Sequence, residues 1–222
     1  MRRLAANFGI ATGAYIGERD DWDAAVGRAA AEGWAFVELT AIVEERLESL
    51  FAFFAGSPDS GARFERISIH APVVFHTSAA SVVERLAGWR PDLDVVFHPD
   101  IYRDEVLLRR LGARTVFENM DVAKRFGRSA ADLRTIFDVF PEAGFCLDVA
   151  HVWTNDPSLN LAYELLDAFG DRLRQLHVSG IEADGIHRPT TIADLDLYEP
   201  VLDQCGHVPW LLEAELVPAP SP

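Results

Sequence analysis

Acidic and imidazole side chains recur along this sequence near the ends of short apolar runs. In chain order they are Glu38, His70, His98, Glu118, Asp148, His151, His177, His187 and Glu213. Carboxylates and imidazoles are common protein ligands for divalent transition metals. A ring of carboxylates would also repel itself and raise its own pKa values unless cations neutralised it. If the fold gathers these residues, we expect a divalent metal site.

The apolar runs alternate with amphipathic stretches. We predict strands at 7–12, 35–40, 67–71, 95–98, 115–119, 144–149, 173–179 and 210–216, and helices at 22–32, 43–55, 81–86, 105–111, 129–140, 159–169 and 192–204. Asp104 and Ser129 have the character of N-caps. Eight strands alternating with helices predict an α/β fold, a compact (β/α)₈ TIM barrel forming one domain over residues 1–222. The alternative, an open doubly wound sheet, lacks its glycine-rich phosphate loop after the first strand.

The composition indicates a globular protein with an acidic surface. Twenty Lys and Arg stand against 35 Asp and Glu, a net charge of −15, and 49% of the residues are hydrophobic. This charge disfavours nucleic acid and anionic membrane as partners, because both require a basic surface. No apolar run is long enough to cross a bilayer, and the start of the chain lacks a convincing signal-peptide cleavage site. We expect a cytoplasmic protein in which Cys146 and Cys205 are reduced.

The order of these motifs resembles the xylose isomerase-like barrels, which include sugar isomerases and epimerases and the endonuclease IV type of nuclease. The resemblance covers nearly the whole chain and is carried by residues 33–39 (GWAFVEL), 69–72 (IHAP), 97–99 (FHP), 117–120 (FENM), 147–151 (LDVAH), 176–179 (LHVS), 187–189 (HRP) and 212–213 (LE). It implies that Glu118, Asp148, His177 and Glu213 share a divalent ion. Mn²⁺ or Zn²⁺ suits such a set, with Co²⁺ or Mg²⁺ as further candidates. In the epimerase branch the two glutamates also act as catalytic acid and base.

The nuclease branch of this family implies further metal sites. His70 and His98 would join Glu118 in a second site, and His151 would pair with an Asp-x-His motif in a third. Here that motif reads Asp184-Gly185-Ile186-His187. This motif is one residue longer than Asp-x-His. The spacing therefore does not predict the third metal site. The resemblance therefore implies between one and three ions.

Several side chains are candidate substrate contacts. Lys124 and Arg188 are candidates for holding a phosphate group, although a solvated helix start explains such residues as well. Trp153 follows His151 closely and could stack on a sugar ring, or it could plug the barrel rim. Glu38 and His151 are the remaining candidates for contacts with substrate. For Glu38, a position behind a metal ligand is the other interpretation.

These features together predict a metal-dependent sugar or sugar-phosphate isomerase/epimerase that transfers protons through an enediolate. The alternatives are an endonuclease IV-like phosphodiester hydrolase and a non-catalytic metal-binding barrel. The prolines after the eighth strand predict that the eighth outer helix is absent, leaving an apolar flank uncovered. Helix 43–55 also carries apolar residues around much of its surface. We therefore expect a homodimer.

Overall fold

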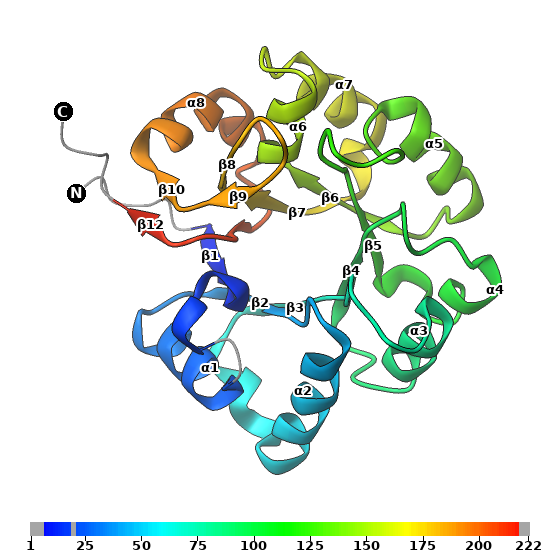
Figure 1. Cartoon of the computed structure of the whole chain (residues 1–222), viewed down its shortest axis with the longest axis vertical. Helices are drawn as coiled ribbons and strands as arrows, with labels where there is room; N and C mark the ends of the chain where they lie inside the picture. Colours follow the sequence, from blue (N-terminus) through cyan, green and yellow to red (C-terminus); the bar gives the residue numbers. More distant parts are fainter. Residues whose placement is uncertain (1–6, 19–20, 218–222) are drawn as a thin grey trace.

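The computed structural model describes residues 7–18 and 21–217. Eight parallel strands close into a barrel in the order β1-β11-β7-β6-β5-β4-β3-β2, and a ring of helices surrounds it (Figure 1). The strands are β1 (Phe8–Ala11), β2 (Phe36–Thr40), β3 (Arg66–His70), β4 (Asp94–Phe97), β5 (Thr115–Glu118), β6 (Gly144–Asp148), β7 (Leu173–Val178) and β11 (Trp210–Leu212). The predicted (β/α)₈ barrel is confirmed, and each of the eight predicted strands corresponds to one strand of the barrel.

The helices follow the strands in turn. They are α1 (Trp22–Ala31), α2 (Glu44–Gly56), α3 (Ala79–Ala87), α4 (Glu105–Leu108), α5 (Ala130–Val139), α6 (Val149–Asn155), α7 (Asn160–Phe169) and α8 (Ile192–Leu202). Asp104 and Ser129 cap α4 and α5 by accepting hydrogen bonds from backbone amides, as predicted. Helix α6 was not predicted from the sequence; it starts immediately after β6. Short strands β8 (Gly180–Ile181), β9 (His187–Arg188), β10 (Thr190–Thr191) and β12 (Leu216–Val217) lie outside the barrel wall.

Alternation along the strands sends one set of side chains outward to the helices and the other into the barrel. Glu38 on β2 meets Gln175 on β7 across the barrel, so both point inward. Val96, Val116 and Cys146 form a separate apolar cluster from three neighbouring strands. The barrel interior therefore combines a small apolar cluster with a fully buried polar layer.

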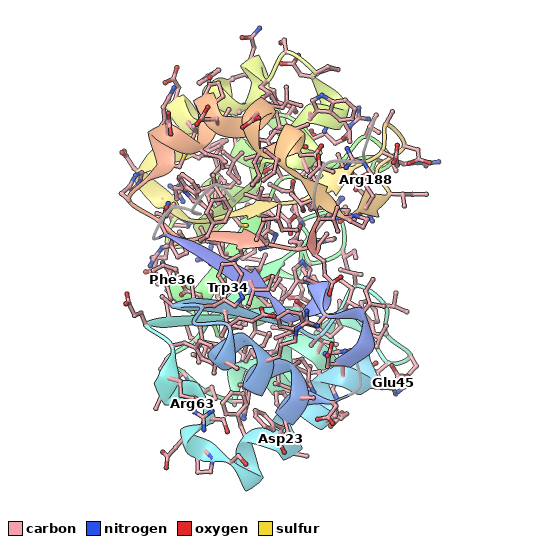
Figure 2. The ribbon with its side chains drawn as sticks, turned by 90° about the vertical axis from the view of Figure 1, so that its left-hand side faces the viewer. Asp23, Trp34, Phe36, Glu45, Arg63 and Arg188 are labelled. Carbon is pink, nitrogen blue, oxygen red and sulfur yellow. The ribbon has the colours of Figure 1, made fainter. Side chains whose placement is uncertain are left out.

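The two ends of the barrel are well separated. Figure 2 shows the barrel from the side, with Trp34 and Phe36 near one end and Glu45 and Arg188 near the other. Trp34 and Phe36 stand at the amino end of β2, whereas Glu45 and Arg188 lie on elements that follow strands. All residues at the carboxyl ends of the parallel strands accordingly face one side of the molecule, where barrels of this kind hold their active sites.

The flank beside β1 and β11 differs from the expectation of an uncovered apolar surface. No helix follows β11 as far as Val217, and the rest of the proposed helix-free tail, residues 218–222, lies outside the described residues. Nevertheless, Phe8 and Trp210 are only 7% and 6% exposed. On α2, Phe51 packs against Trp89 with ring centroids 4.5 Å apart. The apolar surfaces that suggested a homodimer are largely covered, and the dimer itself remains a prediction.

Two further sequence expectations can be compared with the structure. Cys146 and Cys205 are both buried and free, in agreement with reduced thiols. Within residues 7–18 and 21–217, no helix combines the length and apolarity needed to traverse a bilayer.

Candidate metal centre

A cavity of about 690 Å³ opens at the carboxyl ends of the barrel strands. Its lining includes six of the eight predicted metal-ligating residues. These six residues are His70, His98, Glu118, His151, His187 and Glu213. Apolar side chains such as Ile42 and Ile186 line the cavity as well. The cavity therefore places the titratable residues where a small molecule can reach them.

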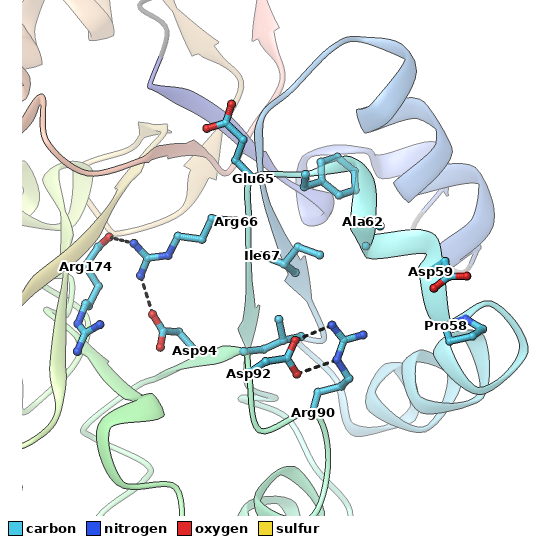
Figure 3. A pocket seen from close by; sticks show the side chains of 13 residues that line it. Pro58, Asp59, Ala62, Glu65, Arg66, Ile67, Arg90, Asp92, Asp94 and Arg174 are labelled. Carbon is cyan, nitrogen blue, oxygen red and sulfur yellow. Dashed lines mark hydrogen bonds and ion pairs between the residues drawn. The ribbon is translucent and has the colours of Figure 1, made fainter.

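A second cavity, of about 480 Å³, lies at the opposite end of the barrel and has a different character. Figure 3 shows Arg66 between Asp94 and the backbone carbonyl of Arg174, with distances of 2.6 and 2.9 Å, and Arg90 paired with Asp92. These ion pairs close the amino end of the barrel. No histidine lines this cavity, and the groups of possible metal ligands found among the described residues all lie at the other end of the barrel.

The first group of possible ligands consists of His70, His98 and Glu118. His70 Nδ1 lies 2.9 Å from the carbonyl oxygen of Ala71, so this nitrogen carries a hydrogen and donates it. The other ring nitrogen, Nε2, then faces Glu118 Oε2 at 3.3 Å. His98 Nε2 approaches the same oxygen at 3.4 Å. Three side chains thus present ligand atoms to one point, which suits a divalent cation.

The second group consists of Glu118, Asp148, His177 and Glu213, the four residues that the family resemblance implied. Their ligand atoms all lie within 4.8 Å of one another. Asp148 Oδ2, His177 Nδ1 and Glu213 Oε2 are buried and have no hydrogen-bond partner. Buried polar atoms are rarely left without partners, so these three fit a cation that they would coordinate. Glu118 contributes to this group and to the first, and could bridge two ions.

Local structure fixes Asp148 in its position. Its Oδ1 accepts a hydrogen bond from the His151 amide at 2.6 Å and caps α6, which leaves Oδ2 for a metal. The side chain of Asn119 exchanges two hydrogen bonds with the backbone of Asp148, at 2.8 and 2.9 Å. The end of β6 is therefore held rigidly from β5.

The third group consists of Asp148, His151 and His187. His151 Nδ1 lies 2.9 Å from the carbonyl oxygen of Asn119, and His151 Nε2 lies 3.0 Å from His187 Nε2. The extra residue of the Asp184–His187 segment falls in the turn between β8 and β9, so it does not displace His187. Asp184 itself is exposed and accepts a hydrogen bond from the Ile186 amide. Contrary to the spacing argument, a third group does form, with Asp148 in place of Asp184.

Gly185 makes this turn possible. Its φ of +90° is unfavourable for residues with a side chain. A Cβ at this position would also lie 2.7 Å from Asp121 Oδ1. The hairpin tip thus packs directly on the loop after β5, which holds His187 over the cavity.

The charges of the cluster shift the pKa values of its members. Burial raises the pKa of the Asp148 carboxyl well above its usual range, and the charges of Glu213 and Glu118 add to this effect. For Glu118, burial opposes ionisation, but the nearby imidazoles, His177 first, hold its pKa well below the usual range. Burial likewise disfavours a charged His151, yet the charge of Asp148 and contact with Glu118 raise its pKa to about 10. Protons thus balance the buried carboxylates, and a divalent cation could replace them.

The predicted substrate contacts are placed differently from one another. Lys124 lines the cavity, with Nζ 3.9 Å from Asp100 Oδ2. Arg188 forms two hydrogen bonds with Asp194, at 2.8 and 2.9 Å, and does not line the cavity. Trp153 packs against the hydrophobic core. Arg188 and Trp153 therefore do not line the cavity, where a predicted substrate contact would lie.

Of the two interpretations of Glu38, its position agrees with the one behind a candidate metal ligand, His177, and not with a substrate contact. Its side chain is completely buried in the barrel interior and does not line the cavity. Arg46, which no sequence pattern singled out, lines the cavity and is 7% exposed. The Arg46 guanidinium stacks over the Trp22 ring at 4.3 Å. Arg46 and Lys124 are the arginine and lysine side chains of the described cavity lining.

Comparison with known proteins adds evidence on the fold. No protein-family model and no curated protein matches the sequence. Among solved structures, a xylose isomerase domain protein from Alicyclobacillus acidocaldarius subsp. acidocaldarius is similar over 97% of this chain and 91% of its own, with a TM-score of 0.60 and 16% identity. A D-tagatose 3-epimerase-like protein aligns over 94% and 90% of the two chains, with a TM-score of 0.56 and 13% identity.

A third similar structure is a xylose isomerase-like TIM barrel protein from Mycobacterium smegmatis in complex with magnesium. It aligns over 95% of this chain and 91% of its own, with a TM-score of 0.54 and 11% identity. Identities at this level establish the architecture rather than the activity. The chain therefore has the fold of the xylose isomerase-like TIM barrels.

Proposed function

We propose that this protein is a metal-dependent isomerase or epimerase that acts on a small hydroxylated carbonyl compound such as a sugar or sugar phosphate. The observation that carries the proposal is the group formed by Glu118, Asp148, His177 and Glu213, of which the two glutamates line the cavity. Three carboxylates and one imidazole form a mixed O and N set, which suits Mn²⁺, Zn²⁺, Co²⁺ or Mg²⁺. The similarity to an epimerase-like structure is compatible with this chemistry.

The two glutamates of this group approach the centre from different strands. Glu118 Oε1 lies 3.4 Å and Glu213 Oε1 3.1 Å from the same atom, His177 Nδ1. Glu118 ends β5, whereas Glu213 follows β11 on another part of the barrel wall. A carbonyl substrate held between them would have one carboxylate to remove a proton and another to return it. A divalent ion bound there would acidify the C–H bond beside a coordinated carbonyl.

The cavity supports a small substrate with a negative group. Its volume of about 690 Å³ is in the range of small-molecule sites. Arg46 and Lys124 line it and could hold a phosphate or carboxylate away from the acidic centre. These two cations are far fewer than a nucleic-acid duplex requires, which agrees with the net charge of −15.

One observation favours a second candidate function, metal-dependent phosphoester hydrolysis. The three groups of possible ligands adjoin one another, sharing Glu118 between the first and second and Asp148 between the second and third. Neighbouring divalent ions are suited to activating water and stabilising a leaving oxygen. An isomerase needs one ion, so full occupancy of all three groups would favour the hydrolase.

A single set of assays separates the two functions. The protein loaded with Mn²⁺, Zn²⁺ or Co²⁺ is incubated in D₂O with a panel of ketoses and ketose phosphates, and proton exchange is followed by NMR. The same preparations are tested on phosphomonoesters, phosphodiesters and an abasic-site oligonucleotide. Exchange at a carbon beside a ketose carbonyl supports the isomerase. Metal-dependent hydrolysis without exchange into any ketose would reject it in favour of the hydrolase.

A further inference from the structure

The geometry points to Glu38 as the residue that positions His177 as a metal ligand, acting from beneath the site with Gln175. Glu38 and His177 are both fully buried, and Glu38 Oε2 lies 3.1 Å from His177 Nε2. The other ring nitrogen, Nδ1, faces Glu118 and Glu213. His177 therefore has one nitrogen directed to the metal group and the other to a buried carboxylate. This inference rests on the proposed metal centre.

The contacts of Glu38 determine which nitrogen of His177 carries the hydrogen. Glu38 Oε2 accepts hydrogen bonds from Gln175 Nε2 at 2.6 Å and from Ser68 Oγ at 3.1 Å. An ionised carboxylate can only accept, so His177 Nε2 must carry a hydrogen to make its contact favourable. The lone pair of the neutral ring then lies on Nδ1, 3.1 Å from Glu213 Oε1, and this contact between two acceptors would become favourable with a cation bound between them. Only this tautomer can coordinate a cation through the nitrogen that faces Glu118 and Glu213.

The opposite tautomer is disfavoured by the same contacts. Gln175 Nε2 lies 3.0 Å from His177 Nε2 and could donate a hydrogen to it. The lone pair on Nε2 would then also face the carboxylate oxygen of Glu38, and two acceptors would repel each other at 3.1 Å. The short bond between Gln175 and Glu38 indicates that the amide hydrogen goes to the carboxylate instead.

Burial makes this contact strong. Glu38 is 0% exposed, and no lysine or arginine forms an ion pair with it within residues 7–18 and 21–217. A buried carboxylate without a compensating positive group is costly. A cation on His177 Nδ1 would polarise the imidazole and strengthen the hydrogen bond to Glu38. The carboxylate would in turn raise the basicity of the ligand, so Glu38 contributes to metal affinity without touching the metal or the substrate.

The test compares Co²⁺ binding by the wild-type protein with two variants. Glu38→Gln keeps the shape of the side chain but removes the charge that faces His177. Ser68→Ala is the matched control, because it removes another hydrogen bond to the same oxygen without altering a group that contacts His177. Co²⁺ affinity is measured by competition with a chelator, and the visible absorption spectrum is recorded at saturation. Circular dichroism monitors folding.

We expect Glu38→Gln to weaken Co²⁺ binding about 10- to 100-fold and to shift its visible spectrum. Ser68→Ala should retain the wild-type affinity and spectrum. Wild-type affinity in Glu38→Gln, or an equal loss in both variants, would overturn the positioning role. A wild-type protein that binds no Co²⁺ would instead refute the proposed metal centre itself.

A second measurement applies if Glu38→Gln does not fold. A crystal structure of the Co²⁺-loaded wild-type protein would reveal which nitrogen of His177 binds the metal. Coordination through Nδ1, with Nε2 directed to Glu38, is the expected result. Coordination through Nε2, or no bond to His177, would overturn the inference.

Discussion

Replacing Asp148 by asparagine should separate metal binding from the structural role of this side chain. Asp148 Oδ1 caps α6 through the His151 amide at 2.6 Å, and an asparagine oxygen can make the same bond. Asp148 belongs to two of the three ligand groups, and its buried Oδ2 has no hydrogen-bond partner. The Asp148→Asn variant should therefore fold normally but lose metal binding at the second group, which it forms with Glu118, His177 and Glu213.

The expected magnitude follows from the linkage between binding and stability. One ion bound at a free concentration 100 times its dissociation constant stabilises the folded state by about 2.7 kcal/mol. For a chain of 222 residues, each kcal/mol raises the melting temperature by roughly 2–4 °C. The wild-type protein should therefore melt about 5–11 °C higher with metal than with a chelator. In Asp148→Asn the part of this difference that comes from the group of Glu118, Asp148, His177 and Glu213 should disappear.

Differential scanning calorimetry with and without Mn²⁺ measures this effect. Asp104→Asn is a suitable control, because Asp104 also caps a helix, accepting from the Leu107 amide at 3.1 Å, but belongs to none of the three ligand groups. The control should retain the metal-dependent shift. An undiminished shift in Asp148→Asn would refute the assignment of Asp148 as a metal ligand.

Three further predictions follow. Glu118→Gln and Glu213→Gln should each abolish solvent-deuterium exchange into a ketose substrate while circular dichroism stays unchanged; wild-type exchange in either variant would exclude that glutamate as an acid or base. His187→Ala should reduce the ions bound at saturating Zn²⁺ by one per chain, measured by mass spectrometry of the metal content, and an unchanged content would exclude the third site. Glu44 is fully buried and accepts hydrogen bonds from Thr77 and the His76 amide, which outweigh burial and lower its pKa from 4.5 to about 2. Because the folded-state pKa is lowered, its stabilisation is present above pH 4.5 and is lost as the pH falls toward 2. Glu44→Gln should cost about 1–3 kcal/mol in urea unfolding at pH 7 and flatten the acid limb of the stability profile, whereas an unchanged profile would contradict this role.

The barrel could be predicted because its local signals agree with one another. Most strands are short apolar runs bounded by turn residues, and apart from α6 the predicted order of barrel strands and helices appears in the structure. Helix α6 was missed because Asp148 ends a strand and caps a helix at the same position. With no turn residues between them, the run from β6 into α6 resembles one continuous apolar segment.

The grouping of the candidate ligand residues could be predicted from the geometry of the barrel. In a parallel barrel, the carboxyl ends of all strands face one side, so residues such as His70 and Glu118 must lie near each other once their strands are located. The third group depended on more than spacing. The β8–β9 hairpin, with Gly185 at positive φ, brings His187 to His151 despite the additional residue.

The substrate contacts were less predictable because they depend on packing between distant segments. Arg188 follows His187 directly, but neighbouring residues of a strand point to opposite sides, and Arg188 pairs with Asp194 instead. Arg46 resembles an ordinary surface arginine near the start of a helix. Its position in the cavity depends on stacking against Trp22 from another helix, which no local pattern reveals.

We propose that the carboxyl end of the barrel holds a metal centre formed by Glu118, Asp148, His177 and Glu213. The most direct test is a crystal structure of the protein saturated with Mn²⁺ or Zn²⁺, with the ions located by anomalous scattering. We predict an ion coordinated by Glu118, Asp148, His177 and Glu213. Absence of any ion from this group at saturating metal, or metal bound only at surface carboxylates, would contradict the account.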